Sequence, residues 1–173
     1  MFYNLLFLSL VLLSSGCAKH KISKTTTNYQ KTTKTDKTDK TDKTTKSISN
    51  NYKTQAIYKE YKKWDNTPYK YGGKDFRGVD CSALIQSVYK NAFGIDIPRT
   101  TIEQIKVGYK INKNSNQSGD LIFFKTSYKD RHIGIIIEKG KFLHSSSKYG
   151  VIISSINNPY WKSNYLQTRR ILP

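Results

Sequence analysis

Hydrophobic side chains are distributed very unevenly along this chain. After a short apolar run over 5–13 they are almost absent up to about residue 54, and from there they recur regularly. The intervening stretch is dominated by Lys, Thr, Asn and Ser, and it repeats the triplet Thr-Asp-Lys over 35–43. A segment this polar cannot bury a core. We therefore predict a disordered tether over 17–53 and one globular domain over 54–173.

Within the domain, the spacing of apolar residues changes from helical to strand-like. Apolar residues at helical spacing predict helices over 55–65, 81–93 and 101–107. Short runs rich in β-branched and aromatic residues predict strands over 120–124, 132–138, 141–146, 151–155 and 165–172. Helices that precede an antiparallel sheet of about five strands are typical of an α+β fold.

Cys81 falls at the predicted start of the second helix, directly after a glycine-rich loop. Unpaired backbone N–H groups and the positive end of the helix dipole favour an anion at such a position. We therefore expect the thiol to have a lowered pKa and to act as a nucleophile. The alternative is a small buried hydrophobic residue, which is what most free cysteines are.

The N-terminal segment helps to decide whether Cys81 is a nucleophile or a buried structural residue. The apolar run over 5–13 is shorter than the ~20 helical residues that cross a bilayer, and small residues follow it before Cys17. This pattern is typical of a secretory signal and resembles a bacterial lipoprotein signal over 1–16, with Cys17 lipidated. An ordinary cleaved signal that leaves Cys17 unmodified is the alternative. A lipidated Cys17 leaves Cys81 without a disulfide partner in an oxidising compartment, which favours a catalytic thiol.

Two histidines in the domain provide the partners that a catalytic thiol needs. His132 opens one predicted strand and His144 lies within the next. Histidine titrates near neutrality, so one can act as the base while the other orients it. Each histidine alone is more often structural. A zinc site made of Cys81 and both histidines lacks a short metal-binding spacing, so we expect no metal and no cofactor.

The formal net charge of +18 narrows the class of partner. Residues 19–53 supply ten Lys and three Asp, and twenty basic and nine acidic residues remain in the domain. A basic domain suits a polyanion, and nucleic acid is one candidate. An exported protein mostly meets envelope polymers and lipids, so we expect no nucleic-acid partner. Because the basic residues are scattered, a solvated cationic surface is the alternative.

An ordered series of motifs resembles the NlpC/P60 family of cell-wall cysteine peptidases. The motifs are TPYKYGG (67–73), GVDCS (78–82), PRT (98–100), GDLIFF (119–124), HIGI (132–135) and KFLHS (141–145). The resemblance covers the domain from about residue 55 and implies a papain-like α+β core. Ala83 stands where the family commonly has glycine.

The resemblance also implies residue roles. Cys81 is expected to be the nucleophile, His132 the base and His144 the third polar residue. Tyr69 is expected to line the site and to help hold the oxyanion. Asp80 and Ser82 are further candidates for oxyanion or substrate contacts.

The implied activity is hydrolysis of murein stem peptides between γ-linked D-glutamate and a diamino acid. The expected partners are these stem peptides and, through lipid on Cys17, a membrane. We expect a monomer at the outer membrane, facing the periplasm. A catalytically silent envelope-binding protein and a thiol amidase or acyltransferase are the alternatives.

Strand register adds a geometric expectation for the two histidines. A regular two-residue turn at Lys139-Gly140 would put His132 and His144 on opposite faces, because side chains alternate along a strand. A shared site therefore requires an odd-residue connection or a β-bulge. We expect bulging between Glu138 and His144 or close to His132, with both imidazoles on one face and His132 next to the Cys81 sulfur.

Overall fold

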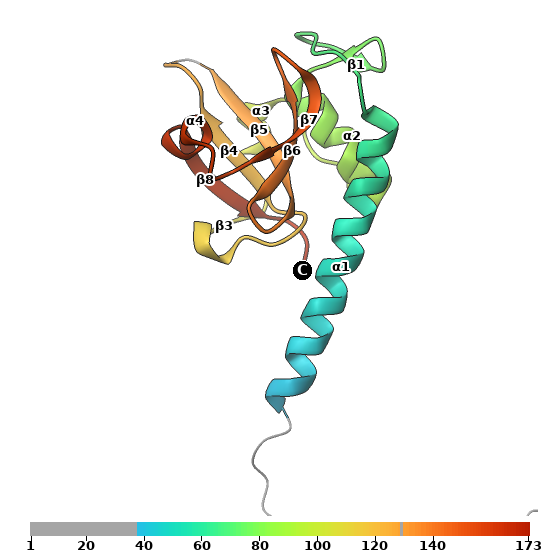
Figure 1. The fold of residues 1–173 in the computed structure, drawn as a ribbon, viewed down its shortest axis with the longest axis vertical. Coiled ribbons are helices and arrows are strands. Elements are labelled where there is room, and N and C mark those ends of the chain that lie inside the picture. Colours follow the sequence, from blue (N-terminus) through green and yellow to red (C-terminus); the bar gives the residue numbers. More distant parts are fainter. Residues whose placement is uncertain (1–37, 129) are drawn as a thin grey trace, which may run out of the picture. The chain divides into compact units, whose positions relative to one another are not determined.

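A computed structural model describes residues 38–128 and 130–173 of the chain. Its helices are α1 (Thr38–Trp64), α2 (Cys81–Phe93), α3 (Thr101–Gln104), the 3₁₀ helix η1 (Lys113–Ser115) and α4 (Pro159–Ser163). Its strands are β1 (Lys74–Asp75), β2 (Gly78–Val79), β3 (Tyr109–Ile111), β4 (Leu121–Lys125), β5 (Arg131–Glu138), β6 (Lys141–Ser146), β7 (Gly150–Ser155) and β8 (Tyr165–Arg170). Figure 1 shows α1 and α2 side by side next to the main sheet.

The main sheet confirms the predicted α+β fold but has an additional strand. Its antiparallel order is β3-β8-β4-β5-β6-β7, and β1 and β2 form a separate hairpin. The prediction of about five strands omitted β3, which pairs only with β8 at the sheet edge. All three residues of β3 are at least partly exposed, so no buried apolar run marks it in the sequence.

Helix α1 begins well before the predicted position. It starts at Thr38 rather than near Gln55, so the prediction of a disordered tether is wrong for residues 38–53. Once a helix is nucleated by a packed segment, each further residue adds one hydrogen bond at little cost. Lys53 provides a tertiary contact before the predicted start, since its side chain is buried and donates to Pro173 O. The predicted signal, Cys17 and the rest of the tether lie outside the described residues.

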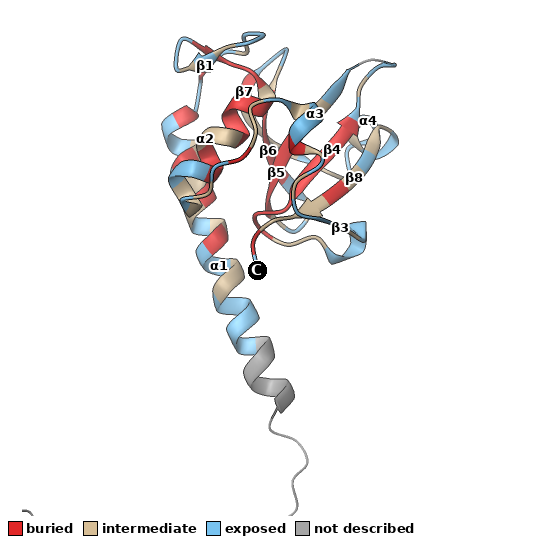
Figure 2. Ribbon diagram, turned by 180° about the vertical axis from the view of Figure 1, so that it is seen from behind, coloured by how far each residue is buried: buried red, intermediate tan, exposed pale blue. Residues whose placement is uncertain are grey.

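Helix α2 has the bounds that the sequence predicts. Asp80 caps its N-terminus by accepting from Ala83 N at 2.7 Å, and Gly94 ends it in the left-handed conformation at φ 69°. The helix buries Leu84, Ile85 and other side chains between α1 and the sheet. Figure 2 shows this burial as red on α2 and on the central strands. No helix in the described part of the chain is long and apolar enough to cross a membrane.

The two faces of the sheet bury separate apolar clusters. The face toward α1 and α2 contributes, among others, Leu121, Phe123, Ile133, Ile135 and Leu143. The opposite face buries Ile122, Phe124, Ile136 and Phe142, with Trp161 of α4 packed against them. Strand β4 is buried on both faces, as predicted from its continuous apolar run.

A β-bulge puts the two histidines on the same face of the sheet. Glu138 pairs with Lys141 across a two-residue turn, but the next pair is Ile136 with Phe142, so Ile137 is the extra residue. The expectation of a bulge is confirmed, although the bulge lies at Ile137, just before the expected stretch from Glu138 to His144. The Ile137 carbonyl accepts from Thr54 Oγ1 at 2.8 Å and from Ser118 Oγ at 2.6 Å, which stabilises the bulge.

Candidate active site

The N-terminus of α2 is held where β5 and β6 separate. The last pair in their ladder is Ile135 with Leu143, so the strands are no longer paired toward His132. On the β6 side, Ser145 Oγ donates to Val79 O at 2.8 Å, which ties the segment before Cys81 to the sheet. The backbone N–H of Ile133 faces the Cys81 sulfur. The thiol therefore lies next to the residue that follows His132.

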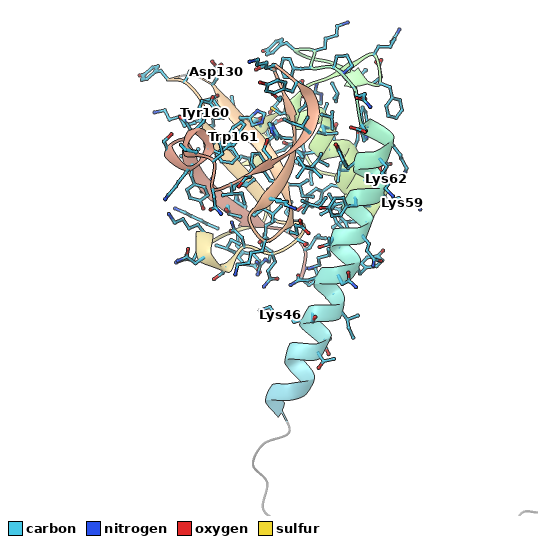
Figure 3. All side chains as sticks on the ribbon, in the orientation of Figure 1. Lys46, Lys59, Lys62, Asp130, Tyr160 and Trp161 are labelled. Carbon is cyan, nitrogen blue, oxygen red and sulfur yellow. The ribbon has the colours of Figure 1, made fainter. Side chains whose placement is uncertain are left out.

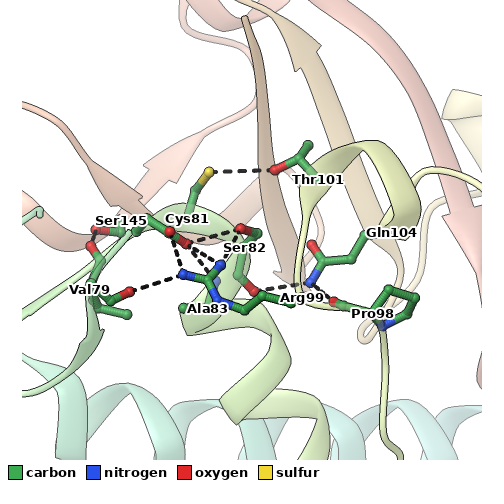
Figure 4. Close-up of polar contacts among 11 residues, drawn as sticks. Val79, Cys81, Ser82, Ala83, Pro98, Arg99, Thr101, Gln104 and Ser145 are labelled. Atoms are coloured by element: carbon green, nitrogen blue, oxygen red, sulfur yellow. Dashed lines mark hydrogen bonds and ion pairs between the residues drawn. The ribbon is translucent and has the colours of Figure 1, made fainter. Parts of the chain in front are cut away.

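The Cys81 thiol is free and hydrogen-bonds to a hydroxyl group rather than to His132. Its sulfur lies 3.8 Å from Thr101 Oγ1 at the start of α3 (Figure 4). Burial raises the pKa of the thiol, and the opposing hydrogen bonds from Ile133 N–H and the Thr101 hydroxyl do not offset that effect. The expectation of a lowered pKa from the helix N-terminus is therefore wrong for this arrangement, because desolvation outweighs the helix end.

A continuous chain of hydrogen bonds begins at His132. Its Nε2 lies 2.9 Å from His144 Nδ1, and His144 Nε2 lies 2.8 Å from Ser154 Oγ. The expectation that both imidazoles share one face within hydrogen-bond reach is confirmed. Because Nε2 of His132 is occupied, Nδ1 is the ring nitrogen left for the thiol. The described residues contain no hydrogen bond between this ring and Cys81, and the expected position of His132 next to the sulfur stays a prediction.

Aromatic rings surround the histidine pair. Trp161 stacks on His132 with ring centroids 5.2 Å apart, and Phe142 stacks on His144 at 4.7 Å. Figure 3 shows Trp161 on α4, next to the sheet. Burial among these rings lowers the pKa of His132 to about 4 and that of His144 well below its usual value. Both imidazoles are therefore neutral near pH 7 in this arrangement.

Gly134 allows this packing. A Cβ atom at Gly134 would lie 2.4 Å from Phe142 Cδ2 and 2.8 Å from Leu143 O. A side chain at this position would push the Phe142 ring away, and that ring supports His144. The glycine of the HIGI motif is thus required by close packing beside the histidine pair.

Arg99 holds the residues on either side of the nucleophile. Its guanidinium donates to both carboxylate oxygens of Asp80, at 3.1 and 2.6 Å, and to Ser82 Oγ at 2.9 Å (Figure 4). Burial would raise the pKa of Asp80, but the hydrogen bonds from Arg99, Ala83 N–H and Ser82 lower it overall. Both candidate side chains, Asp80 and Ser82, are engaged in this network, which orients the start of α2. A direct substrate contact by either stays a prediction.

Tyr69 lies close enough to Cys81 for the charge of a thiolate to affect the pKa of its phenol. Burial raises the pKa of its phenol, and the electrostatic effects of Cys81 and Asp80 raise it further. A protonated phenol near the sulfur can donate a hydrogen bond to an oxygen bound there. An isolated β-bridge between Tyr69 and Val79 holds the backbone of Tyr69 next to the segment that precedes Cys81.

The structure thus brings Cys81, His132, His144 and Tyr69 to one site, and it adds residues that we did not select from the sequence. Trp161, Ser154, Arg99 and Thr101 contact the selected side chains directly. Of these four residues, Arg99 alone had a signal in the sequence, because it belongs to the PRT motif. Among the described residues, no group of three or more His, Cys, Asp and Glu side chains is placed to hold a metal ion.

The lowered pKa of His132 implies a measurable loss of stability in acid. A base with a lower pKa in the folded than in the unfolded chain binds fewer protons when folded, so protonation favours unfolding. As the pH falls from 6.5 toward 4, this histidine should reduce the free energy of unfolding by roughly 3 kcal/mol. Urea unfolding of the protein and of His132→Asn at pH 7 and pH 4 measures this contribution. Carboxylates such as Asp80 contribute equally in both proteins, so identical pH dependence in the two would contradict a neutral, partly buried His132.

Comparison with known proteins is consistent with this site. A profile of the NlpC/P60 family matches residues 66–170. The probable endopeptidase NlpC homolog of Haemophilus influenzae is 43% identical over 68% of this chain and 63% of its own length. The murein DD-endopeptidase MepS/murein LD-carboxypeptidase of Escherichia coli is 40% identical over 67% of this chain and 62% of its own length. The chain thus spans less than two thirds of these two relatives.

A further relative and a solved structure are also similar to this chain. The bifunctional muramidase/DL-endopeptidase CwlT of Bacillus subtilis is 33% identical over 68% of this chain and 36% of its own length. The crystal structure of an NlpC/P60 family protein from Bacillus cereus superposes with a TM-score of 0.62 at 31% identity. That superposition covers 69% of this chain and 40% of the other.

Proposed function

This chain belongs to the NlpC/P60 family, and from that membership and the geometry around Cys81 we propose that it is a thiol endopeptidase of murein stem peptides. The bond that we propose is the one between γ-linked D-glutamate and the following diamino acid. The observation that carries the proposal is the hydrogen bond between His132 Nε2 and His144 Nδ1. It orients the His132 ring and leaves Nδ1 available to a sulfur at the adjacent helix start.

The reaction begins with a change in the position of the sulfur. Cys81 Sγ leaves the Thr101 hydroxyl, turns toward His132 Nδ1 and gives up its proton there. The raised thiol pKa and the lowered pKa of His132 disfavour this charge separation in the free protein. A bound substrate that orders the site is therefore expected to promote the thiolate–imidazolium pair.

Attack and release follow from the same groups. The thiolate forms a bond to the amide carbonyl carbon, and the negative charge moves to the carbonyl oxygen. The Cys81 N–H has no acceptor in the described residues and, together with the Tyr69 hydroxyl, can donate to that oxygen. His132 returns its proton to the leaving amine as the C–N bond breaks. Water then attacks the thioester, His132 takes its proton, and the thiol is regenerated.

Product analysis tests the proposal. The purified protein is incubated with murein and with soluble stem peptides, and new ends are identified by mass spectrometry. We expect a new free amine on the diamino acid and a new carboxylate on D-glutamate. Binding to murein without new ends would instead support a silent envelope-binding protein, and transfer to an added amine would support an acyltransferase.

A second bond is supported by one relative. The Escherichia coli relative is named a DD-endopeptidase and LD-carboxypeptidase, whereas the Bacillus subtilis relative is named in part a DL-endopeptidase. Cleavage of crosslinks would convert dimeric muropeptides to monomers with intact stems, and carboxypeptidase action would release a terminal D-alanine. The same product analysis separates these outcomes from cleavage after D-glutamate.

We also propose that lipid on Cys17 anchors the protein to the outer membrane, facing the periplasm. The support is the apolar run over 5–13 followed by small residues and Cys17. Residues between Cys17 and the start of α1 then give the catalytic domain reach toward the wall. A monomer suits this arrangement, since a tethered domain needs no partner subunit to meet its substrate.

Replacing Cys17 with Ser should release the protein from membranes, because the lipid anchor cannot form without the thiol. Fractionation of cells that express the full chain measures this, with Cys81→Ala as the control that should stay membrane-bound. If Cys17→Ser still sediments with membranes after a high-salt wash, the anchor is a retained signal segment or another membrane contact.

A further inference from the structure

Ser154 lies at the end of the histidine chain that is farthest from the thiol. It belongs to β7, where it pairs with Phe142, and His144 pairs with Ile152. Side chains at alternate positions share a face, so Ser154 and His144 project on the same side of the sheet. The Ser154 hydroxyl oxygen lies 2.8 Å from His144 Nε2.

The protons on this chain have two possible arrangements in the neutral state. A neutral imidazole carries one N–H, so exactly one of the two facing nitrogens of His132 and His144 is the donor. If His144 Nδ1 is the donor, the proton of His132 lies on Nδ1 and this ring cannot accept the thiol proton. If His132 Nε2 is the donor, its Nδ1 is free to accept, and the proton of His144 lies on Nε2, directed at Ser154.

Transfer of the thiol proton leaves only the second arrangement. An imidazolium at His132 donates from both ring nitrogens, so His144 Nδ1 must accept. The proton of His144 is then on Nε2, and the nearest oxygen is Ser154 Oγ. A serine hydroxyl can accept a hydrogen bond as well as donate one.

We propose that Ser154 is a positioning residue: by accepting from His144 Nε2 it completes the proton arrangement in which His132 can hold the proton of Cys81. The proposal rests on the thiol chemistry proposed above. Its physical basis is the cost of an unsatisfied N–H in a buried site.

Ser154 Oγ is the one hydrogen-bond partner of His144 Nε2 in the part of the chain that the structure describes. His144 is 1% exposed, and its aromatic neighbours are Phe142 of β6 and Trp161 of α4. Phe124 of β4 packs near His132. Asp80 and Arg99 form a charged pair beside the thiol, and within the described residues neither is hydrogen-bonded to His144. The lowered pKa values of both histidines are consistent with a site this apolar.

Three variants test the proposal: Ser154→Ala, Ser154→Thr and Ser155→Ala. Ser154→Ala removes the acceptor, and Ser154→Thr keeps a hydroxyl. The control, Ser155→Ala, changes an exposed neighbour on the same strand, whose hydroxyl oxygen accepts from Asn157 N. The first readout is the rate of Cys81 alkylation by iodoacetamide across pH, which reports the thiolate and needs no murein. The second is kcat/KM on stem peptides.

We expect Ser154→Ala to raise the apparent pKa of the thiolate by about one unit and to lower kcat/KM about tenfold or more, because a hydrogen bond that supports a charged group is lost. Ser154→Thr should restore both values and Ser155→Ala should match the unchanged protein. An alkylation profile in Ser154→Ala identical to the unchanged protein would overturn the proposal. A shifted alkylation profile in a protein that does not cleave murein would support this proposal and overturn the proposed function.

Nitrogen NMR of the imidazoles gives a check that does not depend on folding of a variant. In the unchanged protein, under conditions where the spectrum shows His132 as the imidazolium, His144 should be protonated at Nε2 and unprotonated at Nδ1. Protonation of His144 at Nδ1 under those conditions would overturn the proposal.

Discussion

Replacing Cys81 with alanine is expected to abolish murein cleavage, with a loss of at least about 10⁴-fold in kcat. The thiol is the group that forms the covalent intermediate, and Thr101, which is hydrogen-bonded to the same sulfur, is an unactivated hydroxyl that cannot replace it. The assay is the release of new amine ends from murein. Circular dichroism of the same sample checks that the variant is folded. The helix should persist because alanine is a good helix former and the Asp80 cap does not involve the thiol.

Undiminished cleavage by Cys81→Ala would end the thiol-peptidase account. A serine at this position is the matched comparison, because it keeps a small polar group of similar shape. We expect Cys81→Ser to be nearly as inactive, since a hydroxyl is far less acidic than a thiol and the lowered pKa of His132 makes it a weak base.

Replacing His132 with alanine should cost about 10³-fold or more in kcat/KM, because both proton transfers pass through this ring. The His132→Ala substitution should also change the rate at which the Cys81 thiol is alkylated. Without His132 no base takes the thiol proton when the sulfur turns away from Thr101, so alkylation near neutral pH should be slower than in the unchanged protein. Parallel assays of cleavage and alkylation measure the two effects in one protein.

His144→Ala is the graded control for the base. It removes the group that orients His132 but leaves the base in place, so cleavage should fall less than in His132→Ala. Equal or greater loss in His144→Ala, with the fold intact, would indicate that His144 itself takes the thiol proton.

Elements with strong local signals could be predicted from the sequence. The bounds of α2 follow from a capping aspartate, helical apolar spacing and Gly94, and each of these signals operates within the element. The strands β4 to β7 were found because their apolar runs are bounded by turns. The start of α1 could not be found, because residues 38–53 carry no apolar periodicity and their helix continues from a packed segment.

The need for a bulge could be predicted, but its position could not. Alternation of side chains shows that a regular hairpin separates His132 from His144, which is a statement about register alone. The position at Ile137 depends on two hydroxyl groups from distant segments, Thr54 and Ser118, that bond its carbonyl. Such long-range contacts leave no local pattern.

The residues that complete the site were missed for the same reason. Trp161 lies in a short helix far along the chain and reaches His132 only through the fold. Ser154 is one of two serines in its strand, and only register identifies the one that faces His144. The direction of the thiol pKa was wrong because the sequence shows the helix end but not the burial around it.

One measurement tests the central claim most directly: cleavage of a soluble L-Ala-γ-D-Glu-diamino acid peptide in the presence of hydroxylamine. A thioester between Cys81 and the D-glutamyl group would be intercepted, so we expect L-Ala-γ-D-Glu hydroxamate together with the free diamino acid. Mass spectrometry identifies both products, and Cys81→Ala should give neither. Full-rate cleavage at another bond, or cleavage that yields only the free acid and persists in Cys81→Ala, would contradict the account.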